Sequence, residues 1–207
     1  METPNILIAC EESQTICNTF RKAGYHAYSC DLQTCSGGHP QWHIIGDAAS
    51  VIEGHNTYMT QAGYYITIDR HWDMIIAHPP CTMLSKVSAP SLSTGKHTMH
   101  QVQEAAQFFM RLYNAPSQFV AIENPIPLLS AKLPQYTQII NPIDYGHEYS
   151  KQTCLWLRNL PPLLPTHATC LHPKSWVLTG SSRAKRRSKT FQGIADAMAA
   201  QWLPLLF

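Results

Sequence analysis

The sequence predicts an α/β fold with a doubly wound, mostly parallel sheet. Short β-favouring runs alternate with helical segments, which is typical of parallel sheets. Asn5–Cys10, Gln14–Ala23 and Tyr25–Cys30 predict a strand, a helix and a strand, a unit whose two strands lie parallel with a right-handed crossover. Polar residues follow the strands, at the edge where such sheets bind ligands.

The composition fits one compact domain, or a domain with a small appendage. The chain has 207 residues, 44% of them hydrophobic and 14% charged, which suffices for a buried core and argues against disorder. The formal net charge of +2 excludes a polycation that binds nucleic acid by charge alone. Its 7 cysteines show no paired spacing, and apolar runs such as Met74–Ala77 are too short to cross a membrane. We therefore expect a cytoplasmic protein with reduced thiols and no signal peptide.

The other elements follow in order. Gly24 ends the first helix, because glycine is the usual residue after a helix C-terminus. Trp72–Ala77 predicts a buried strand that two prolines end, and Ser85–Lys96, rich in Ser, Pro and Gly, predicts a mobile loop. We expect the later elements to be a helix at His97–Tyr113, a strand at Phe119–Ile122, short strands near Gln138–Ile143 and Thr153–Leu157 in an irregular, proline-rich region, and a closing helix at Gln192–Trp202.

Polar side chains at the strand ends are the candidate site residues. Asp31 follows the second strand, where an acidic side chain is placed to hydrogen-bond the ribose of an adenosine cofactor; a turn or helix-cap role is the alternative. The loop Cys10–Gln14 contains no glycine, so a cofactor without phosphates fits it better than a dinucleotide. The full set of strand-end candidates is Glu11, Glu12, Ser13, Asp31, Asp47, His78–Cys81, Glu123 and Asn124.

Cys81 is the candidate nucleophile. It follows Pro79 and Pro80, which stiffen the backbone after a buried strand. A thiol is largely protonated at neutral pH and needs activation. Glu123 ends the next strand along the chain, so we expect its carboxyl group to lie beside the thiol. The alternative is that Cys81 is a small buried hydrophobic residue.

These motifs resemble those of the cytosine-C5 DNA methyltransferases, and most of all the short phage- and prophage-encoded proteins of that type. Two motifs carry the resemblance. The family's Asp-x5-Pro-Pro-Cys-x3-Ser and Glu-Asn motifs are matched by Asp73, Pro79, Pro80, Cys81 and Ser85, and by Glu123 and Asn124. The resemblance covers most of residues 5–202, and residues 36–43 and 150–157 are similar to the short phage proteins.

The resemblance implies a Rossmann-like, S-adenosylmethionine-dependent fold and a covalent mechanism. It implies that the Cys81 thiolate adds to C6 of a cytosine, while Glu123, with Asn124 in the same motif, binds N3 and the amino group. The base must be flipped out or presented single-stranded, with residues 82–96 as a lid. The implied cofactor contacts are Glu11, Glu12, Ser13, Asp31, Asp47 and Pro79.

The chain departs from the family in three places. The glycine-rich first loop is missing, and the family's Gln-x-Arg-x-Arg run reads Tyr-Ser-Lys-Gln-Thr, with Lys151 at one arginine position. Residues 192–197 resemble a degraded Gly-Asn helix. We predict a catalytic core over residues 1–157, a reduced, basic target-recognition segment over 158–190 and a closing helix over 191–207.

The expected partner is DNA, as duplex or single strand. The cationic side chains near residue 185 suit contacts to DNA phosphates, which give affinity but little recognition of base sequence. We therefore expect weak sequence specificity or a short recognition sequence. A solvated loop is the alternative for this cluster. The predicted DNA contacts are Ser85, Lys151, Arg183, Lys185, Arg186, Arg187 and Lys189.

Other functions stay open. Because the first loop and the arginine motif depart from the family, the chain could be a binding or decoy protein that does not transfer methyl groups. The presence of both Cys81 and Glu123 favours an enzyme. An adenine amino-methyltransferase or a folate-dependent pyrimidine enzyme would share parts of the proline–cysteine motif. Two groups of side chains could bind zinc: Cys30, Cys35, His39 and His43, and His167, Cys170 and His172. Neither has the compact spacing of a strong zinc motif, so we expect no metal.

Overall fold

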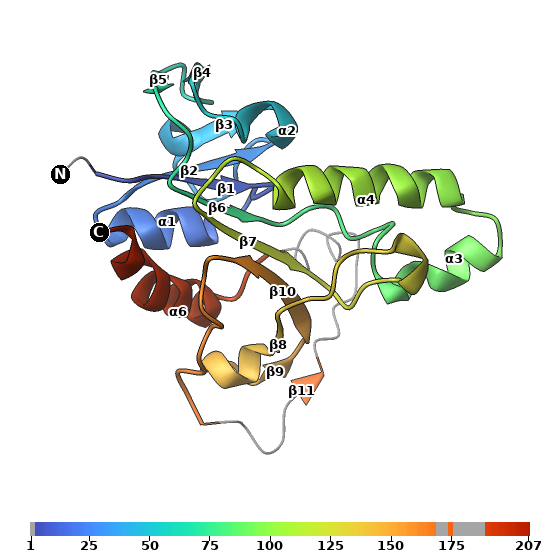
Figure 1. Ribbon diagram of the computed structural model, residues 1–207. Coiled ribbons are helices and arrows are strands. Elements are labelled where there is room, and N and C mark those ends of the chain that lie inside the picture. Colours follow the sequence, from blue (N-terminus) through green and yellow to red (C-terminus); the bar gives the residue numbers. More distant parts are fainter. Residues whose placement is uncertain (1–2, 169–173, 176–188) are drawn as a thin grey trace.

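A central sheet of seven strands organises the computed structural model, which describes residues 3–168, 174–175 and 189–207 (Figure 1). The strand order is β3-β2-β1-β6-β7-β10-β8. Neighbours from β3 to β7 are parallel, and β10 is antiparallel to both β7 and β8. The predicted α/β fold with a mostly parallel sheet is therefore confirmed. The strands are β1 (Asn5–Ala9), β2 (His26–Asp31), β3 (His43–Ile45), β6 (Met74–Ala77), β7 (Phe119–Asn124), β8 (Gln138–Ile140) and β10 (Thr153–Arg158).

Helices cover both faces of the sheet. α1 (Thr15–Lys22) and α6 (Gln192–Trp202) lie side by side on one face, and α2 (Ala48–Val51) and α4 (Met99–Tyr113) on the other (Figure 1). Alternate strand residues supply the two hydrophobic cores: Ile6 packs with the α1 and α6 residues, whereas its neighbour Leu7 packs with those of α4. The strand order reverses between β1 and β6, so the crevice of a doubly wound sheet lies at the carboxyl ends of these two strands.

The segment expected as a loop after β6 contains helical structure. The 3-10 helix η2 (Lys86–Ser88) leads into α3 (Ala89–Ser93). Pro90 lies in the first turn of α3, where its fixed φ favours the helix, and its carbonyl accepts hydrogen bonds from the hydroxyls of Ser93 and Thr94. The remaining short elements are η1 (Pro40–Trp42), η3 (Leu129–Ala131), η4 (Pro142–Tyr145), η5 (Leu203–Leu206), β9 (Tyr149–Ser150) and β11 (Lys174–Ser175).

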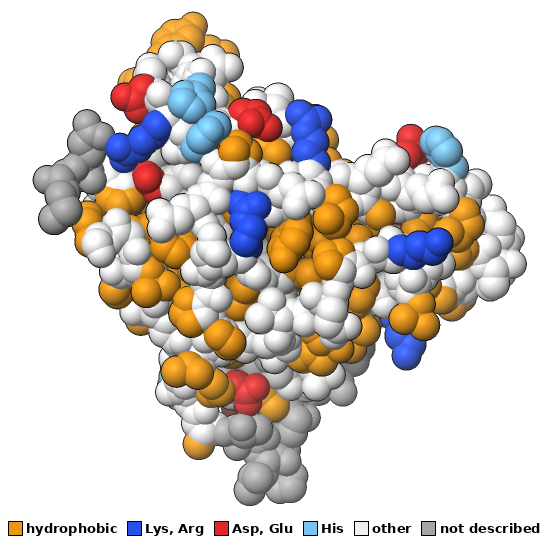
Figure 2. All heavy atoms as spheres, in the orientation of Figure 1, with side chains coloured by type: hydrophobic (Ala, Val, Ile, Leu, Met, Phe, Trp, Pro, Cys, Tyr) orange, Lys and Arg blue, Asp and Glu red, His pale blue; other side chains and the backbone are white. Residues whose placement is uncertain are grey.

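A hairpin that sequence reasoning missed projects from the sheet. β4 (Asn56–Met59) and β5 (Tyr65–Ile68) pair antiparallel, and Figure 2 shows hydrophobic side chains at its tip, at the top of the view. Met59, Tyr64 and Tyr65 are exposed there. In the part of the chain that is described, no helix has the length and apolar character needed to cross a membrane.

The two ends of α4 are fixed by side chains. Thr98 and Gln101 form a capping box at its start, since each side chain bonds the backbone of the other residue. At the other end the guanidinium of Arg158, from β10, donates hydrogen bonds to the carbonyl oxygens of Tyr113, Ala115 and Ser117. These contacts hold α4 against the neighbouring strands.

Candidate active site

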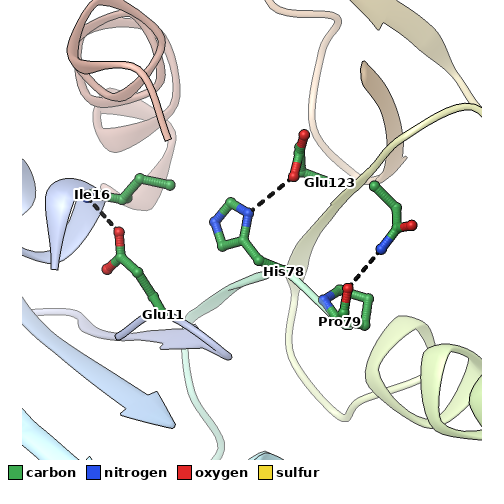
Figure 3. Close-up of polar contacts among 6 residues, drawn as sticks. Glu11, Ile16, His78, Pro79 and Glu123 are labelled. Carbon is green, nitrogen blue, oxygen red and sulfur yellow. Dashed lines mark hydrogen bonds and ion pairs between the residues drawn. The ribbon is translucent and has the colours of Figure 1, made fainter. Parts of the chain in front are cut away.

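Three side chains meet at the carboxyl ends of β1, β6 and β7. Glu11 follows β1, His78 follows β6 and Glu123 lies near the end of β7. Figure 3 shows the His78 ring between the Glu11 and Glu123 carboxylates. The strand register explains why these side chains lie close together. Ala77 pairs with Ala9 of β1 and with Ile122 of β7, so the residues that follow are also neighbours.

His78 bonds Glu123 directly. Its Nδ1 lies 3.3 Å from Oε2 of Glu123, and the side chains are only 10% and 21% exposed. The other ring nitrogen, Nε2, is buried and has no hydrogen-bond partner within the described residues. A buried imidazole nitrogen without a partner is costly, so this atom is a point where a ligand can bind.

Glu11 is buried and holds the start of α1. Its carboxylate oxygens accept hydrogen bonds from the backbone N–H groups of Ile16 (2.7 Å) and Cys17 (3.2 Å). Burial raises the pKa of Glu11 to about 7, against the lowering effect of the His78 charge and of these backbone hydrogen bonds. Glu11 therefore changes charge close to neutral pH.

The pKa of Glu123 is shifted in the opposite direction from that of Glu11. Burial by itself raises its pKa, but the hydrogen bond from His78, the charges of His78 and Lys151, and a hydrogen bond from Thr153 outweigh burial and lower the pKa below its usual value. Glu123 is therefore an ionised carboxylate at neutral pH, held by cationic and hydrogen-bonding side chains.

A small cavity adjoins this pair. Its walls come from the end of the sheet, from the β9–β10 turn and from the start of α6. The residues of its wall that bear on the chemistry are His78, Glu123, Lys151, Thr153, Lys189 and Phe191. Lys189 also donates a hydrogen bond to Oγ of Ser36 (3.1 Å), which ties this wall to the loop after β2. The predicted DNA contacts Lys151 and Lys189 are thus brought together beside Glu123.

Cys81 is exposed on the loop after β6. This loop is tied to the residues after β7, because Asn124 Nδ2 donates to the Pro79 carbonyl (2.7 Å, Figure 3) and the backbone N–H of Lys86 donates to the carbonyl of Ile126 (2.8 Å). The carbonyl of Cys81 accepts from the N–H of buried Ser85. Cys81 and Glu123 thus lie at one sheet edge, but Cys81 does not line the cavity beside Glu123. Their direct proximity stays a prediction.

The expected cofactor residues lie at the carboxyl ends of β1, β2 and β3. Asp31 is partly exposed, and its Oδ1 accepts from the N–H of Gln33, which is the turn role considered as the alternative. Asp47 caps α2 by accepting from the N–H of Ala49. Glu12 is buried, and the Ser13 hydroxyl lies 3.1 Å from that of Thr15. Cofactor contacts by these residues, and by Glu11 and Pro79, stay predictions.

The first zinc hypothesis gains no support from the geometry. Both ring nitrogens of His43 already have partners, the Ser29 hydroxyl and the Gln33 carbonyl, and His39 stacks on Trp42. Over residues 3–168, 174–175 and 189–207, no three His, Cys, Asp or Glu side chains form a group able to hold a metal ion. The predicted ligands and DNA contacts that lie outside the described residues are Cys170, His172, Arg183, Lys185, Arg186 and Arg187.

Sequence reasoning placed His78 among the strand-end residues but gave it no role. The signal that identifies it is its position: it is the first residue after β6, and the strands on both sides of β6 end in glutamate-bearing segments. Only the sheet order shows that β6 lies between β1 and β7.

Comparison with solved structures finds similarity to two methyltransferases at low sequence identity. One is a protein assigned as a DNA modification methyltransferase encoded within a prophage (E. coli), with 14% identity and a TM-score of 0.45 over 75% of this chain and 46% of that chain. The other is the methyltransferase EhMeth of Entamoeba histolytica, with 12% identity and a TM-score of 0.39 over 84% of this chain and 57% of that chain. The chain thus spans about half the length of these proteins. No family model and no curated protein matches it.

Proposed function

We propose that the protein is an S-adenosylmethionine-dependent DNA (cytosine-5)-methyltransferase. The observation that carries the proposal is the joining of two loops at one sheet edge. The loop that bears Cys81 and the segment after Glu123 are linked by the Asn124–Pro79 hydrogen bond and by the backbone pairing of Lys86 with Ile126. These links support a nucleophile loop at the same sheet edge as a carboxylate that can bind a base.

The chemistry needs both groups. C5 of cytosine is a weak nucleophile, so the Cys81 thiolate first forms a bond to C6, and the C5=C6 electron pair becomes available at C5. Glu123 is placed to bind N3 and the exocyclic amino group of the base and to stabilise the charge that develops there. Loss of the C5 proton then re-forms the double bond and expels the thiolate.

The cofactor would lie at the carboxyl ends of β1 and β2. S-adenosylmethionine, when bound, supplies an electrophilic methyl group. The partly exposed carboxylate of Asp31 fits this cofactor, since an acceptor at this position binds ribose hydroxyls. S-adenosylmethionine has no phosphate groups, so the loop from Cys10 to Gln14, which contains no glycine, does not need to form a phosphate-binding turn.

DNA is the proposed partner. Because C6 is unreachable inside a duplex, the base must be flipped out or presented on a single strand. The exposed Cys81 loop lies at an edge where such a base can approach. Lys151 and Lys189 supply positive charge beside Glu123, which suits a nearby phosphate backbone. We propose residues 158–190 as the remainder of the DNA-contacting region.

The experiment follows transfer of a tritiated methyl group from S-adenosylmethionine to unmethylated DNA, with the product base identified after digestion. Wild type, Cys81→Ala, Glu123→Gln and the control Glu104→Gln, which removes an exposed carboxyl group on α4, are compared. Cofactor binding to each protein is measured by calorimetry to show that the variants are folded. DNA containing 5-fluorocytosine should trap a denaturation-resistant adduct, because fluorine cannot leave C5 as a proton does.

Label in 5-methylcytosine that persists in Glu104→Gln and is lost in Cys81→Ala, together with the adduct, would support the proposal. Folded, cofactor-binding wild type that labels neither duplex nor single-stranded DNA would overturn it. Label in N6-methyladenine would assign the protein to a different methyltransferase class.

A further inference from the structure

We infer that His147 is a positioning residue that holds Lys189 and Phe191 in the wall of the cavity beside Glu123. This role rests on the proposed function, in which Lys189 contacts DNA, and His147 is a residue that the proposed function does not include. His147 lies between η4 and β9 and is not itself part of the cavity wall. It acts through the start of α6, which it contacts in two ways.

The first contact supplies a helix cap that α6 otherwise lacks. The first N–H groups of a helix have no partner within the helix, and a Ser, Thr, Asn or Asp side chain at the N-cap usually accepts from one of them. The N-cap residue of α6 is Phe191, whose side chain has no acceptor. Instead, Nε2 of His147 accepts a hydrogen bond from the backbone N–H of Gly193 (3.0 Å). An imidazole 46 positions earlier in the chain therefore caps α6.

This hydrogen bond needs a neutral imidazole. Nε2 can accept only when its lone pair is available, so the ring proton must be on Nδ1. Burial lowers the pKa of His147, the charge of Asp196 raises it and that of His167 lowers it, and the resulting pKa is below the usual value. The imidazole is therefore neutral at neutral pH, as the cap requires.

The second contact holds the ring of Phe191. The ring centroids of His147 and Phe191 lie 4.9 Å apart in an edge-to-face arrangement, which is favourable for aromatic pairs. Nζ of Lys151 lies 5.8 Å from the centroid of the same phenyl ring, within the range of a cation–π interaction. Phe191 therefore connects His147 to Lys151, which also lines the cavity.

Close packing restricts the start of α6. A Cβ atom at Gly193 would overlap the carbonyl oxygen of Tyr145 and lie 3.1 Å from Nε2 of His147, so the helix backbone lies directly on this segment. Lys189 comes shortly before Phe191 in the chain and lines the cavity with it. With the first turn of α6 fixed, the charge of Lys189 is held where it can meet a DNA phosphate.

The test compares wild type, His147→Leu, His147→Gln and the control His100→Leu, which alters an exposed histidine on α4. Leucine keeps much of the bulk without an acceptor, whereas Oε1 of glutamine can take the place of Nε2. Binding of a duplex oligonucleotide is measured by fluorescence anisotropy at several salt concentrations. KM for DNA and kcat are measured by transfer of a tritiated methyl group from S-adenosylmethionine.

The expected effect is on DNA binding and not on the chemical step. His147→Leu should raise the dissociation constant and KM for DNA by roughly 3- to 10-fold and change kcat by less than about 2-fold. The slope of log affinity against log salt should become shallower by about 1, as for the loss of one phosphate contact. His147→Gln and His100→Leu should stay within about 2-fold of wild type in all these values.

The substitution Lys189→Gln distinguishes positioning of this lysine from a general loss of structure. It should weaken DNA binding in wild type but have little further effect in His147→Leu, because the lysine charge no longer occupies its place in the cavity wall. Additive effects of the two substitutions would overturn the inference. A fall in kcat as large as the rise in KM in His147→Leu would also overturn it.

A spectroscopic readout in wild type requires neither activity nor DNA. In protein labelled with nitrogen-15, an N–H···N hydrogen bond transmits a scalar coupling between the backbone nitrogen of Gly193 and Nε2 of His147. The imidazole should also show the tautomer with its proton on Nδ1. Absence of either signal would overturn the inference even if His147→Leu fails to fold.

The role of His147 and the proposed function can fail separately. A folded His147→Leu variant with the DNA affinity and KM of wild type would overturn the role of His147 and leave methyl transfer intact. Wild type that binds DNA but transfers no methyl group to it would overturn the proposed function, while the affinity and NMR measurements would still decide the role of His147. Wild type that does not bind DNA would overturn both.

Discussion

Replacement of Glu11 by Gln should change how the stability of the protein depends on pH. Glu11 is 3% exposed and bonds the backbone N–H groups of Ile16 and Cys17 at the start of α1. Glutamine has nearly the same shape and keeps an acceptor oxygen for Ile16, but it cannot ionise. Differences between the two proteins that vary with pH therefore report the Glu11 carboxyl group.

The direction and size of the expected change in stability follow from the pKa of Glu11, which burial raises from an ordinary 4.5 to about 7. Between these values the folded protein keeps a proton that the unfolded chain has released, so the free energy of unfolding falls as pH rises. Each pH unit contributes about 1.4 kcal/mol, or about 3 kcal/mol over the whole interval. This stability is fully present below pH 4.5 and is lost above pH 7.

The assay is urea unfolding of wild type and Glu11→Gln at half-unit steps from pH 5 to pH 8. The free-energy difference between them should shift by about 2–3 kcal/mol across this range, in favour of the variant at high pH. Glu53→Gln, which removes an exposed carboxyl group, is the matched control. Parallel curves for wild type and Glu11→Gln, within about 0.5 kcal/mol, would refute the assignment of the titration to Glu11.

Three further predictions concern stability. Gly193→Ala should lower the free energy of unfolding by about 3 kcal/mol in chemical denaturation, because its Cβ would lie near the Tyr145 carbonyl oxygen, far inside contact distance; stability equal to wild type would contradict this packing. Arg158→Met should cost about 2–3 kcal/mol, since the carbonyl groups of Tyr113, Ala115 and Ser117, at and just after the end of α4, lose the hydrogen bonds from the guanidinium, and a melting temperature within 1–2 °C of wild type would count against it. Thr98→Ala should cost about 1 kcal/mol and increase hydrogen exchange in the first turn of α4, because it removes the capping box; unchanged exchange there would argue that the box is unimportant.

Several buried elements could be predicted from the sequence, whereas the buried helix α2, the exposed β4–β5 hairpin and the partly exposed helix α3 were missed. The closing helix agrees residue for residue with α6, and the strand expected near Thr153–Leu157 in the proline-rich region agrees with β10 to within one residue. The β4–β5 hairpin was missed because only Tyr58 and Ile68 of its strands are buried, so no apolar alternation marks it. α3 was missed because its Ser- and Pro-rich composition also suits a loop.

The site could be predicted only in part, for a topological reason. Strand-end positions identified Glu11 and Glu123 as candidates because each directly follows a strand predicted from the sequence. Their relation through His78 depends on β6 inserting between β1 and β7, a pairing between segments that are far apart in the sequence. Lys189 reaches the same cavity from near the end of the chain. No local pattern contains these long-range contacts.

The two prolines after β6 explain why Glu123 depends on side chains. Pro79 and Pro80 have no N–H, so the backbone at this strand end cannot donate hydrogen bonds to a neighbouring carboxylate. Glu11 obtains such bonds from α1, and burial still raises its pKa. Glu123 is instead held by His78, Lys151 and Thr153, and charged partners lower its pKa despite burial. The same proline motif that stiffens the Cys81 loop therefore leaves the Glu123 carboxylate to side-chain partners, of which the imidazole of His78 is in direct contact with it.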